Sequence, residues 1–245
     1  MSDASLRQAH VVMNLESRQY KGEKIARLLD LASRPAVQHM LEVGTGSGGI
    51  AHYFGTHASL RYTVDAIDLN DHRMIMEGYR YLQADGTRLP FCDQTFDIVL
   101  SNHVIEHVGE RAAQMEHLHE LRRVLKPGGC GYLAVPNRWM MIEPHYKLAF
   151  LSWLPRAWRT PYLRLCKKGR IYDCEPLQMK QLEVMMQRAG MDVCNMGVEA
   201  LRVTLNIEHP GGWMDTVVRR IPDGVLESFN RVIPTLIYRF ARSNP

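Results

Sequence analysis

Apolar and polar positions alternate regularly over the first two-thirds of this 245-residue chain. Short apolar runs predict buried strands at 38–43, 62–67, 80–84, 96–101 and 131–136. Stretches with apolar residues every three or four positions predict helices at 19–33, 48–55, 71–79 and 110–125. This order of elements is typical of βα units wound around a mostly parallel sheet.

The pattern changes after Pro136. Residues 138–170 are rich in Trp, Pro, Arg and Lys and lack the period of a βα unit. Farther along, the sequence predicts a helix near 176–189, strands at 191–198 and 201–207, and a helical tail over 212–242 with breaks at Pro222 and Pro234.

Composition narrows the class of protein. The chain is 46% hydrophobic and 23% charged, which excludes disordered and collagen-like sequences. No apolar run reaches the roughly 18 residues of a membrane span, and the N-terminal segment lacks the apolar core of a signal peptide. The five cysteines are scattered and form no CxxC pair, which favours reduced thiols. We therefore expect a cytoplasmic protein.

The most informative segment is residues 40–49, in which an apolar strand runs into alternating glycines and a helix follows. Glycine permits positive φ and lets a ligand approach the backbone closely. The start of the helix offers N–H groups to a negatively charged group. Asp68 ends the second predicted strand, where a carboxylate accepts hydrogen bonds from ribose hydroxyls. Together these features predict a site for a nucleoside-containing cofactor.

The glycines alone do not select the cofactor, because Gly44, Gly46 and Gly49 also satisfy the GxGxxG pattern of NAD sites. Two further acids favour S-adenosylmethionine. Glu42 precedes the loop, where an acid holds a cationic amino group, and Asp85 follows the third strand, where a carboxylate accepts from an adenine amino group. An NAD-linked oxidoreductase and a non-catalytic cofactor-binding or scaffold protein stay open as alternatives.

The segments LEVGTGSGG, AIDLND, QADGTRLPFCDQTFDIVLSNHVIEHV and LRRVLKPGGCGYLAVPN follow one another within residues 38–137. In this order they resemble the class I S-adenosylmethionine-dependent methyltransferases, in a branch that acts on small molecules. The resemblance implies an α/β, Rossmann-like fold with a seven-stranded, mostly parallel sheet, helices on both faces and an irregular helical insert after the fifth strand. The expected parts of this single domain (1–245) are a helical cap (1–37), a cofactor-binding core (38–137), a basic, aromatic insert (138–175) and the C-terminal helices and last strands (176–245).

The resemblance also implies the cofactor, S-adenosylmethionine, and its product, S-adenosylhomocysteine. The residues expected to bind it lie in or beside the matched segments, with one aromatic residue from the N-terminal helix. They are Glu42, Gly44, Thr45, Gly46, Gly48, Asp68, Leu69, Asp85, Gly86, Ser101, Asn102 and Tyr20.

Methyl transfer from a sulfonium needs mainly alignment, but an oxygen or nitrogen acceptor also loses a proton, which histidine removes well near neutral pH. His103 and His107 follow the fourth predicted strand, at the end where such sheets bind ligands, and His145 lies in the insert. We expect His107 first, then His103 and His145, as catalytic residues, and O-methylation as the reaction. The alternative is that Glu106 and His107 only cap and pack a short helix.

Residues 103–107 also spell HxxEH, a zinc-peptidase signature. That signature lies within a helix and needs a distant acidic ligand, whereas this segment directly follows a strand. The sequence therefore predicts no metal site. His117 and His119 lie on a helix rich in Glu and Arg, and we expect both on the surface.

The insert concentrates positive charge and tryptophan. Its bases are Arg138, Lys147, Arg156, Arg159, Arg164, Lys167, Lys168 and Arg170, against the single acid Glu143, so the rest of this +4 chain is slightly acidic. The first interpretation is a helical excursion packed on the core, with its tryptophans buried and its bases solvated. Bases mixed with Trp, Leu and Phe also suit a lid over an apolar substrate or a membrane interface.

The expected partner is a small apolar or lipid-linked molecule, with peripheral membrane contact through 138–170 left open. Nucleic acid is not expected, although an RNA methyltransferase is the weaker alternative. The oligomeric state is left open.

Overall fold

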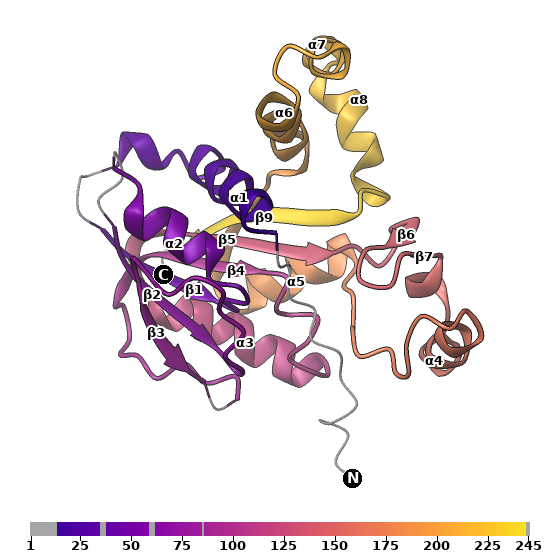
Figure 1. Cartoon of the computed structure of the whole chain (residues 1–245), viewed down its shortest axis with the longest axis horizontal. Helices are drawn as coiled ribbons and strands as arrows, with labels where there is room; N and C mark the ends of the chain where they lie inside the picture. Colours follow the sequence, from indigo (N-terminus) through magenta and orange to yellow (C-terminus); the bar gives the residue numbers. More distant parts are fainter. Residues whose placement is uncertain (1–13, 35–37, 59–61, 85, 244–245) are drawn as a thin grey trace.

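The computed structural model describes residues 14–34, 38–58, 62–84 and 86–243 and shows one seven-stranded sheet with helices on both faces (Figure 1). The strands are β1 (Gln38–Val43), β2 (Tyr62–Asp68), β3 (Arg80–Gln83), β4 (Phe96–Asn102), β5 (Leu125–Pro136), β8 (Met191–Asn195) and β9 (Thr235–Arg242). Their order in the sheet is β3-β2-β1-β4-β5-β9-β8. The first five strands are parallel to one another, and β9 is antiparallel to both of its neighbours.

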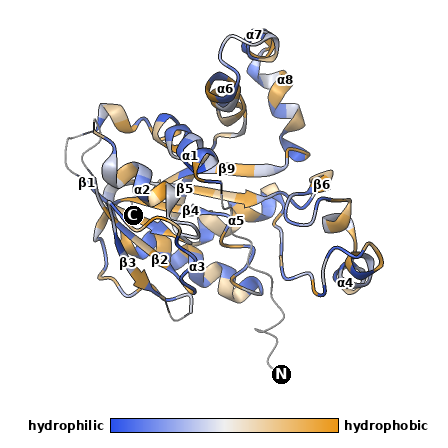
Figure 2. Ribbon diagram, in the orientation of Figure 1, coloured by the Kyte–Doolittle hydropathy of each residue, from blue (hydrophilic) through white to orange (hydrophobic). Residues whose placement is uncertain are grey.

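The two faces of the sheet carry different helices. One face is covered by α1 (Leu15–Leu28), α2 (Gly49–Thr56) and α6 (Gly197–Glu208), the other by α3 (Arg111–Val124) and α5 (Met179–Arg188). The alternation of side chains along each strand divides the core: Met40 packs beneath α1 and α2, whereas Leu41 packs towards α3. Figure 2 shows the apolar residues concentrated in the strands of this sheet.

Two helical excursions leave this core. The first follows β5 and contains β6 (Ile142–Glu143), β7 (Leu148–Ala149) and α4 (Arg156–Leu165). It packs around a small cluster of its own, which includes Tyr146, Leu151 and Leu163. The second lies between β8 and β9 and contains α6, α7 (Trp213–Arg220) and α8 (Asp223–Ser228) (Figure 1). The first excursion follows β5 and the second connects β8 to β9, so both occur after the regular βα units end.

Most of the predicted elements before residue 137 are present, but the helix expected at 71–79 is not. In this segment the backbone N–H groups donate to a side chain and to another loop instead of to helical carbonyls. The carboxylate of Asp71 accepts from the backbone N–H of Arg73, and the N–H of Met74 donates to the carbonyl of Ser47 at 2.9 Å. The segment therefore forms a loop fastened to the glycine loop.

Two predictions for the C-terminal part are wrong. Residues 201–207, expected as a strand, belong to the helix α6, which packs on α1 and accepts a bond from Arg27 through Asn206. The last part of the tail, expected as helix, is the strand β9. Its alternating Leu236, Tyr238 and Phe240 pack on the α3 and α5 side of the sheet, and only pairing with β5 and β8 makes this arrangement favourable.

Candidate active site at the mouth of the sheet

The glycine loop between β1 and α2 has the conformation that the sequence predicts. Gly44, Gly46 and Gly48 have φ values of 83°, 54° and 83°, which residues with a Cβ adopt only with strain. A Cβ on Gly44 would collide with Val104, and one on Gly48 with the hydroxyl of Tyr79. The loop thus presents bare backbone at the start of α2, where N–H groups favour a negatively charged ligand group.

Asp68 ends β2 directly beside this loop. Its Oδ2 accepts from the backbone N–H of Gly46 at 2.8 Å, so the carboxylate is held at the rim of the loop. Leu69, the next residue, has half of its surface exposed (51%), and Gly86 has a φ of 92°. Asp85, the predicted adenine contact, lies outside the described residues.

Two buried polar atoms lie where the order of the strands reverses, between β1 and β4. Within the described part of the chain, Oε2 of Glu42 and Oδ1 of Asn102 are buried without a hydrogen-bond partner. Burial raises the pKa of Glu42 to about 8, although the backbone of Ala51 and the charge of Arg18 oppose this shift. A ligand that brings an ammonium group would supply the missing donors. The site therefore fits the amino-acid end of S-adenosylmethionine.

The hydroxyl groups of Ser101 and Thr45 contact groups in the protein interior. Oγ of Ser101 lies 3.0 Å from Nε2 of His117, and both residues are buried. Oγ1 of Thr45 donates to the carbonyl of Ile67. The surface location expected for His117 is wrong, because its side of α3 packs on the sheet, and burial lowers its pKa to about 4. His119 is exposed, as expected.

Tyr20 does not lie over the glycine loop. Its hydroxyl donates to Glu16 on the same helix, and 40% of its surface is exposed. The side of α1 that meets the loop carries other residues: a Cβ on Gly49 would touch Arg18 and Leu15. The difference arises because Tyr20 is two positions from Arg18, about 200° around a helix.

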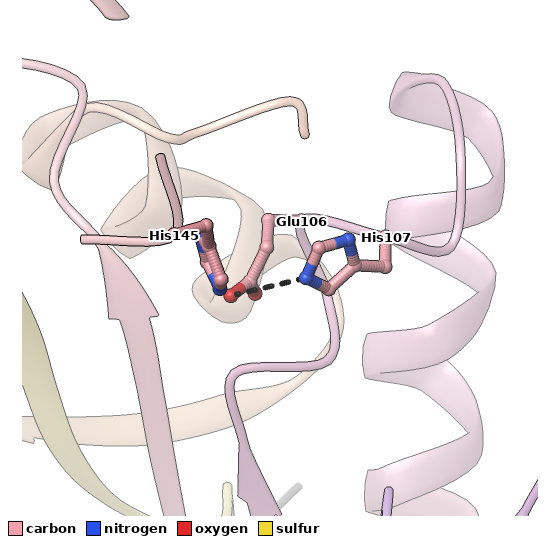
Figure 3. Close-up of side chains that lie close together, drawn as sticks. All are labelled: Glu106, His107 and His145. Atoms are coloured by element: carbon pink, nitrogen blue, oxygen red, sulfur yellow. Dashed lines mark ion pairs between the residues drawn. The ribbon is translucent and has the colours of Figure 1, made fainter. Parts of the chain in front are cut away.

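The structure brings the three predicted catalytic histidines together. His103 and His107 follow β4, and His145 comes from the insert. The ring centroids of His107 and His145 are 5.4 Å apart, and those of His103 and His145 are 6.4 Å apart. Figure 3 shows the carboxylate of Glu106 pointing between the rings of His107 and His145. We refer to His103, Glu106, His107, Glu143, His145 and Cys174 as the histidine cluster.

Acidic groups surround these rings. Oε1 of Glu106 lies 3.2 Å from Nδ1 of His103, and Oε1 of Glu143 lies 2.7 Å from Nδ1 of His145. Both carboxylates belong to residues that are only 1% exposed. Burial alone would lower the pKa of His145, but the hydrogen bond with Glu143 raises it overall. Burial also raises the pKa of the Cys174 thiol well above its usual value.

Hydrogen bonds fasten the three segments of the cluster to one another. The backbone N–H of Glu175 donates to the carbonyl of Glu106 at 2.8 Å. The buried side-chain amide of Gln114, on α3, donates to the carbonyls of both Ile105 and Glu175. The cluster is thus a fixed part of the fold. It also adjoins the glycine loop, because Val104 lies against Gly44.

The insert presents apolar and basic side chains to solvent. Trp158 and Leu165 are 67% and 80% exposed, so the packed excursion with buried tryptophans is wrong for this part. One predicted surface base, Arg159, is buried and donates to the carbonyl of Leu154. Within the described residues, no helix is both long enough and apolar enough to span a membrane.

Comparison with known proteins agrees with this geometry. The methyltransferase domain family matches residues 41–133, which run from β1 to β5 and include the glycine loop, Asp68 and the β4 end. The match covers less than half of the chain, so residues 41–133 are similar to a methyltransferase domain. An uncharacterized methyltransferase of Mycobacterium sp. (strain KMS) is 34% identical to this chain over 103 residues. These residues are 41% of this chain and 39% of that protein.

Two further relatives carry more specific names. The ubiquinone/menaquinone biosynthesis C-methyltransferase of Idiomarina loihiensis is 31% identical over 101 residues, 37% of this chain and 39% of its own. The demethylmenaquinone methyltransferase of Chlorobaculum parvum is 27% identical over 124 residues, 48% of this chain and 49% of its own. The chain therefore spans less than half the length of these curated relatives.

Solved structures share the fold across nearly the whole chain. A chain from the complex between the Haloferax volcanii Trm112 methyltransferase activator and a methyltransferase has a TM-score of 0.57 and 17% identity. The match covers 94% of this chain and 92% of that one. The Haemonchus contortus phosphoethanolamine N-methyltransferase 2, solved with S-adenosyl-L-methionine, has a TM-score of 0.53 and 18% identity, covering 91% of this chain and 52% of that one.

Sequence reasoning missed several residues that the fold brings to the site. Glu143 was counted only as the single acid of the insert, and Cys174 only as a scattered thiol. Both face His145, with Sγ of Cys174 at 3.9 Å from its Nδ1. The pattern EPH, with an acid two positions before a histidine in an apolar segment, is the one local signal for the Glu143–His145 pair.

Proposed function

We propose that this chain is an S-adenosylmethionine-dependent methyltransferase that acts on a small apolar or lipid-linked acceptor. The observation that carries the proposal is the joint between the glycine loop and the histidine cluster, where Val104 lies on Gly44. A cofactor bound by the loop at the β1–β4 crossing would lie next to the cluster. An acceptor that reaches the cluster is therefore next to the methyl donor.

The chain's own residues hold the cofactor by its ends. Asp68 would accept from the ribose hydroxyls, Glu42 and Asn102 would accept from the amino group, and the N-terminus of α2 would donate to the carboxylate. When bound, S-adenosylmethionine supplies a methyl group on a cationic sulfur, a leaving group that needs no further activation. The contribution of the protein is then alignment of the acceptor and exclusion of water.

Transfer forms one bond between the acceptor atom and the methyl carbon and breaks the carbon–sulfur bond, whose electron pair remains on sulfur. An O–H or N–H acceptor also releases a proton. Removal of that proton by His107, His103 or His145 stays a prediction, as does O-methylation. The names of the quinone-type relatives support a small apolar acceptor, and one of them specifies C-methylation.

The exposed side chains of the insert support a lipid-linked acceptor. Its large exposed apolar side chains are Trp139, Met141, Ile142, Phe150, Trp153, Trp158 and Leu165. The exposed bases of the same segment are Lys147, Arg156, Arg164, Lys167, Lys168 and Arg170. This mixture is typical of surfaces that lie at the interface of an anionic membrane. We infer peripheral membrane contact through the insert.

The test combines binding and turnover. Calorimetry with S-adenosylhomocysteine should give micromolar binding to the full chain. Incubation with methyl-labelled S-adenosylmethionine and an extract separated into lipid, quinone, RNA and protein fractions should label the lipid or quinone fraction. Failure to bind S-adenosylhomocysteine would refute the proposal. Label in the RNA fraction would show that the acceptor is RNA and not a small apolar or lipid-linked molecule.

A further inference from the structure

The histidine cluster has the composition and spacing of a metal site. Glu106, His107 and His145 each place one ligand atom so that all three lie within 4.8 Å of one another. Nε2 of His107 and Oε1 of Glu106 are 4.0 Å apart. Two atoms bound to the same ion, each at about 2.1 Å, lie no more than about 4.2 Å apart. Small side-chain rotations therefore bring the set to bonding distance.

A second observation points to a missing cation. Oε2 of Glu106 is buried without a hydrogen-bond partner in the described part of the chain, and Figure 3 shows this carboxylate between the two rings. The buried carboxylate of Glu143 lies beside the same His145 ring. Buried carboxylates among imidazole rings are ligand types that divalent transition-metal ions take.

Glu143 is placed to orient the third ligand. Its carboxylate holds Nδ1 of His145 at 2.7 Å, so a metal ion in the cluster would bind through the opposite ring nitrogen, Nε2. Carboxylate–histidine–metal arrangements of this kind are the usual support of histidine ligands. Two other sets of side chains in the described residues have metal-ligand spacing, namely His107, Asp173 and Cys174, and Glu143, His145 and Cys174. Both need the Cys174 thiol, and in the second set Glu143 would be a ligand instead of the support of His145.

We propose that Glu106, His107 and His145 bind a divalent transition-metal ion such as Zn²⁺, with Glu143 as the positioning residue for His145. Two imidazoles and one carboxylate suit Zn²⁺ and Fe²⁺ and leave coordination positions open. Because the cluster adjoins the glycine loop, an ion bound there would lie near the methyl acceptor. This last step rests on the proposed function and favours acceptors with an oxygen donor, whose deprotonated form a bound ion stabilises.

The test is titration of the chelator-treated full chain with Zn²⁺ alone, followed by calorimetry. We expect one Zn²⁺ per chain, loss of this binding in His107→Ala and in His145→Ala, and a roughly 10- to 100-fold weaker affinity in Glu143→Gln. His119→Ala, on the exposed side of α3, is the matched control and should bind like the wild type. Absence of binding to the wild type, or equal binding by all variants, overturns the proposal.

X-ray absorption identifies the ligands. Nitrogen and oxygen neighbours at about 2.0–2.1 Å support the assignment, whereas a sulfur neighbour at about 2.3 Å overturns it in favour of Cys174. Glu106→Gln keeps the volume of the side chain and tests the same site if a histidine variant fails to fold.

Binding of S-adenosylhomocysteine is measured on the same samples. Zinc without S-adenosylhomocysteine binding refutes the proposed function alone, and the reverse result refutes the metal site alone. Metal binding to these nitrogens also excludes His107 and His145 as proton acceptors, so the titration decides between the two roles.

Discussion

The glycine loop and the histidine cluster touch through Gly44 and Val104, yet they are built in different ways. The loop takes all its parts from a few consecutive residues between β1 and α2, and its important groups are backbone atoms at positive φ. The cluster takes side chains from the segment after β4, from the hairpin β6–β7 and from the chain just before Leu177. Its important groups are ionisable side chains, and several of them are buried.

The difference separates two parts of one sheet edge. One part lies within the match to a protein family, and the other extends outside it. The family match covers 41–133 and so includes the loop and the β4 end but not the insert. The predicted cofactor-binding residues therefore lie mostly in the part that matches the methyltransferase domain family. We propose that contact with the acceptor depends on the insert, which lies outside that match.

The largest effect should come from filling the loop. In Gly44→Ala, strain at positive φ and the collision with Val104 should together lower the free energy of unfolding by about 2–5 kcal/mol and abolish S-adenosylhomocysteine binding. The matched control is Gly128→Ala, where φ is 74° but nothing lies within 4 Å of the added Cβ. The control should lose only about 1–2 kcal/mol, measured by urea unfolding. Equal losses would show that the contact between loop and cluster is unimportant.

The stability of the fold should depend on pH through His117, which is buried on α3 against the sheet. His117 keeps the neutral form in the fold because burial lowers its pKa to about 4, whereas the unfolded chain takes up the proton near 6.5. Stability should therefore fall by about 3 kcal/mol as pH drops from 6.5 to 4. His117→Gln should remove this share of the pH dependence, and His119→Gln should not. Parallel stability curves for wild type and His117→Gln would contradict the assignment.

Asp68→Ala should separate the loop from the cluster. Loss of charge-assisted bonds to the ribose should weaken S-adenosylhomocysteine binding about 100-fold, or about 3 kcal/mol, while Zn²⁺ binding stays unchanged. Asp71→Ala removes a nearby carboxylate that pairs with Arg73 and should bind the product normally. Calorimetry with both ligands measures the two outcomes. A parallel loss of Zn²⁺ would show that the two regions form one unit.

Gln114→Ala should weaken Zn²⁺ binding and leave S-adenosylhomocysteine binding intact. Its amide bonds the β4 end to the end of the insert, so its loss should cost about 2 kcal/mol of stability and weaken Zn²⁺ binding. Binding of S-adenosylhomocysteine should be unaffected. Gln187→Ala, on the exposed side of α5, is the control. Intact Zn²⁺ affinity in Gln114→Ala would mean that the cluster holds its geometry without this link.

The smallest effects should come from single bases of the insert. Lys167→Gln or Lys168→Gln should lower binding to anionic vesicles about fivefold each, from about 1 kcal/mol per charge, and leave S-adenosylhomocysteine binding intact. Neutral vesicles serve as the control, and cosedimentation gives the partition. Arg159 is unsuitable for this series because it is buried. Unchanged partition on anionic vesicles would remove membrane contact from the proposed function.

The strand and helix pattern up to residue 137 was readable from the sequence because each βα unit buries its own apolar face. The exception, 71–79, fails because Asp71 and Ser47 offer its backbone other partners. At the C-terminus the prediction failed for α6 and β9. Residues 235–242 become a strand because they pair with β5 and β8 on both sides. The alternation of Leu236, Tyr238 and Phe240 is a local sign of this strand, but it is short and lies in a tail with helical spacing.

The sequence by itself determined the glycine loop, the acid at the end of β2 and the class of cofactor, because all of them follow from short-range spacing and from what glycine permits. Only the tertiary structure decided that His145 and Glu143 meet His107 and Glu106, that His117 is buried, and that Tyr20 faces away from the loop. The physical reason is distance along the chain. Contacts between segments dozens of residues apart depend on packing and on hydrogen bonds such as those of Gln114, which no local pattern encodes.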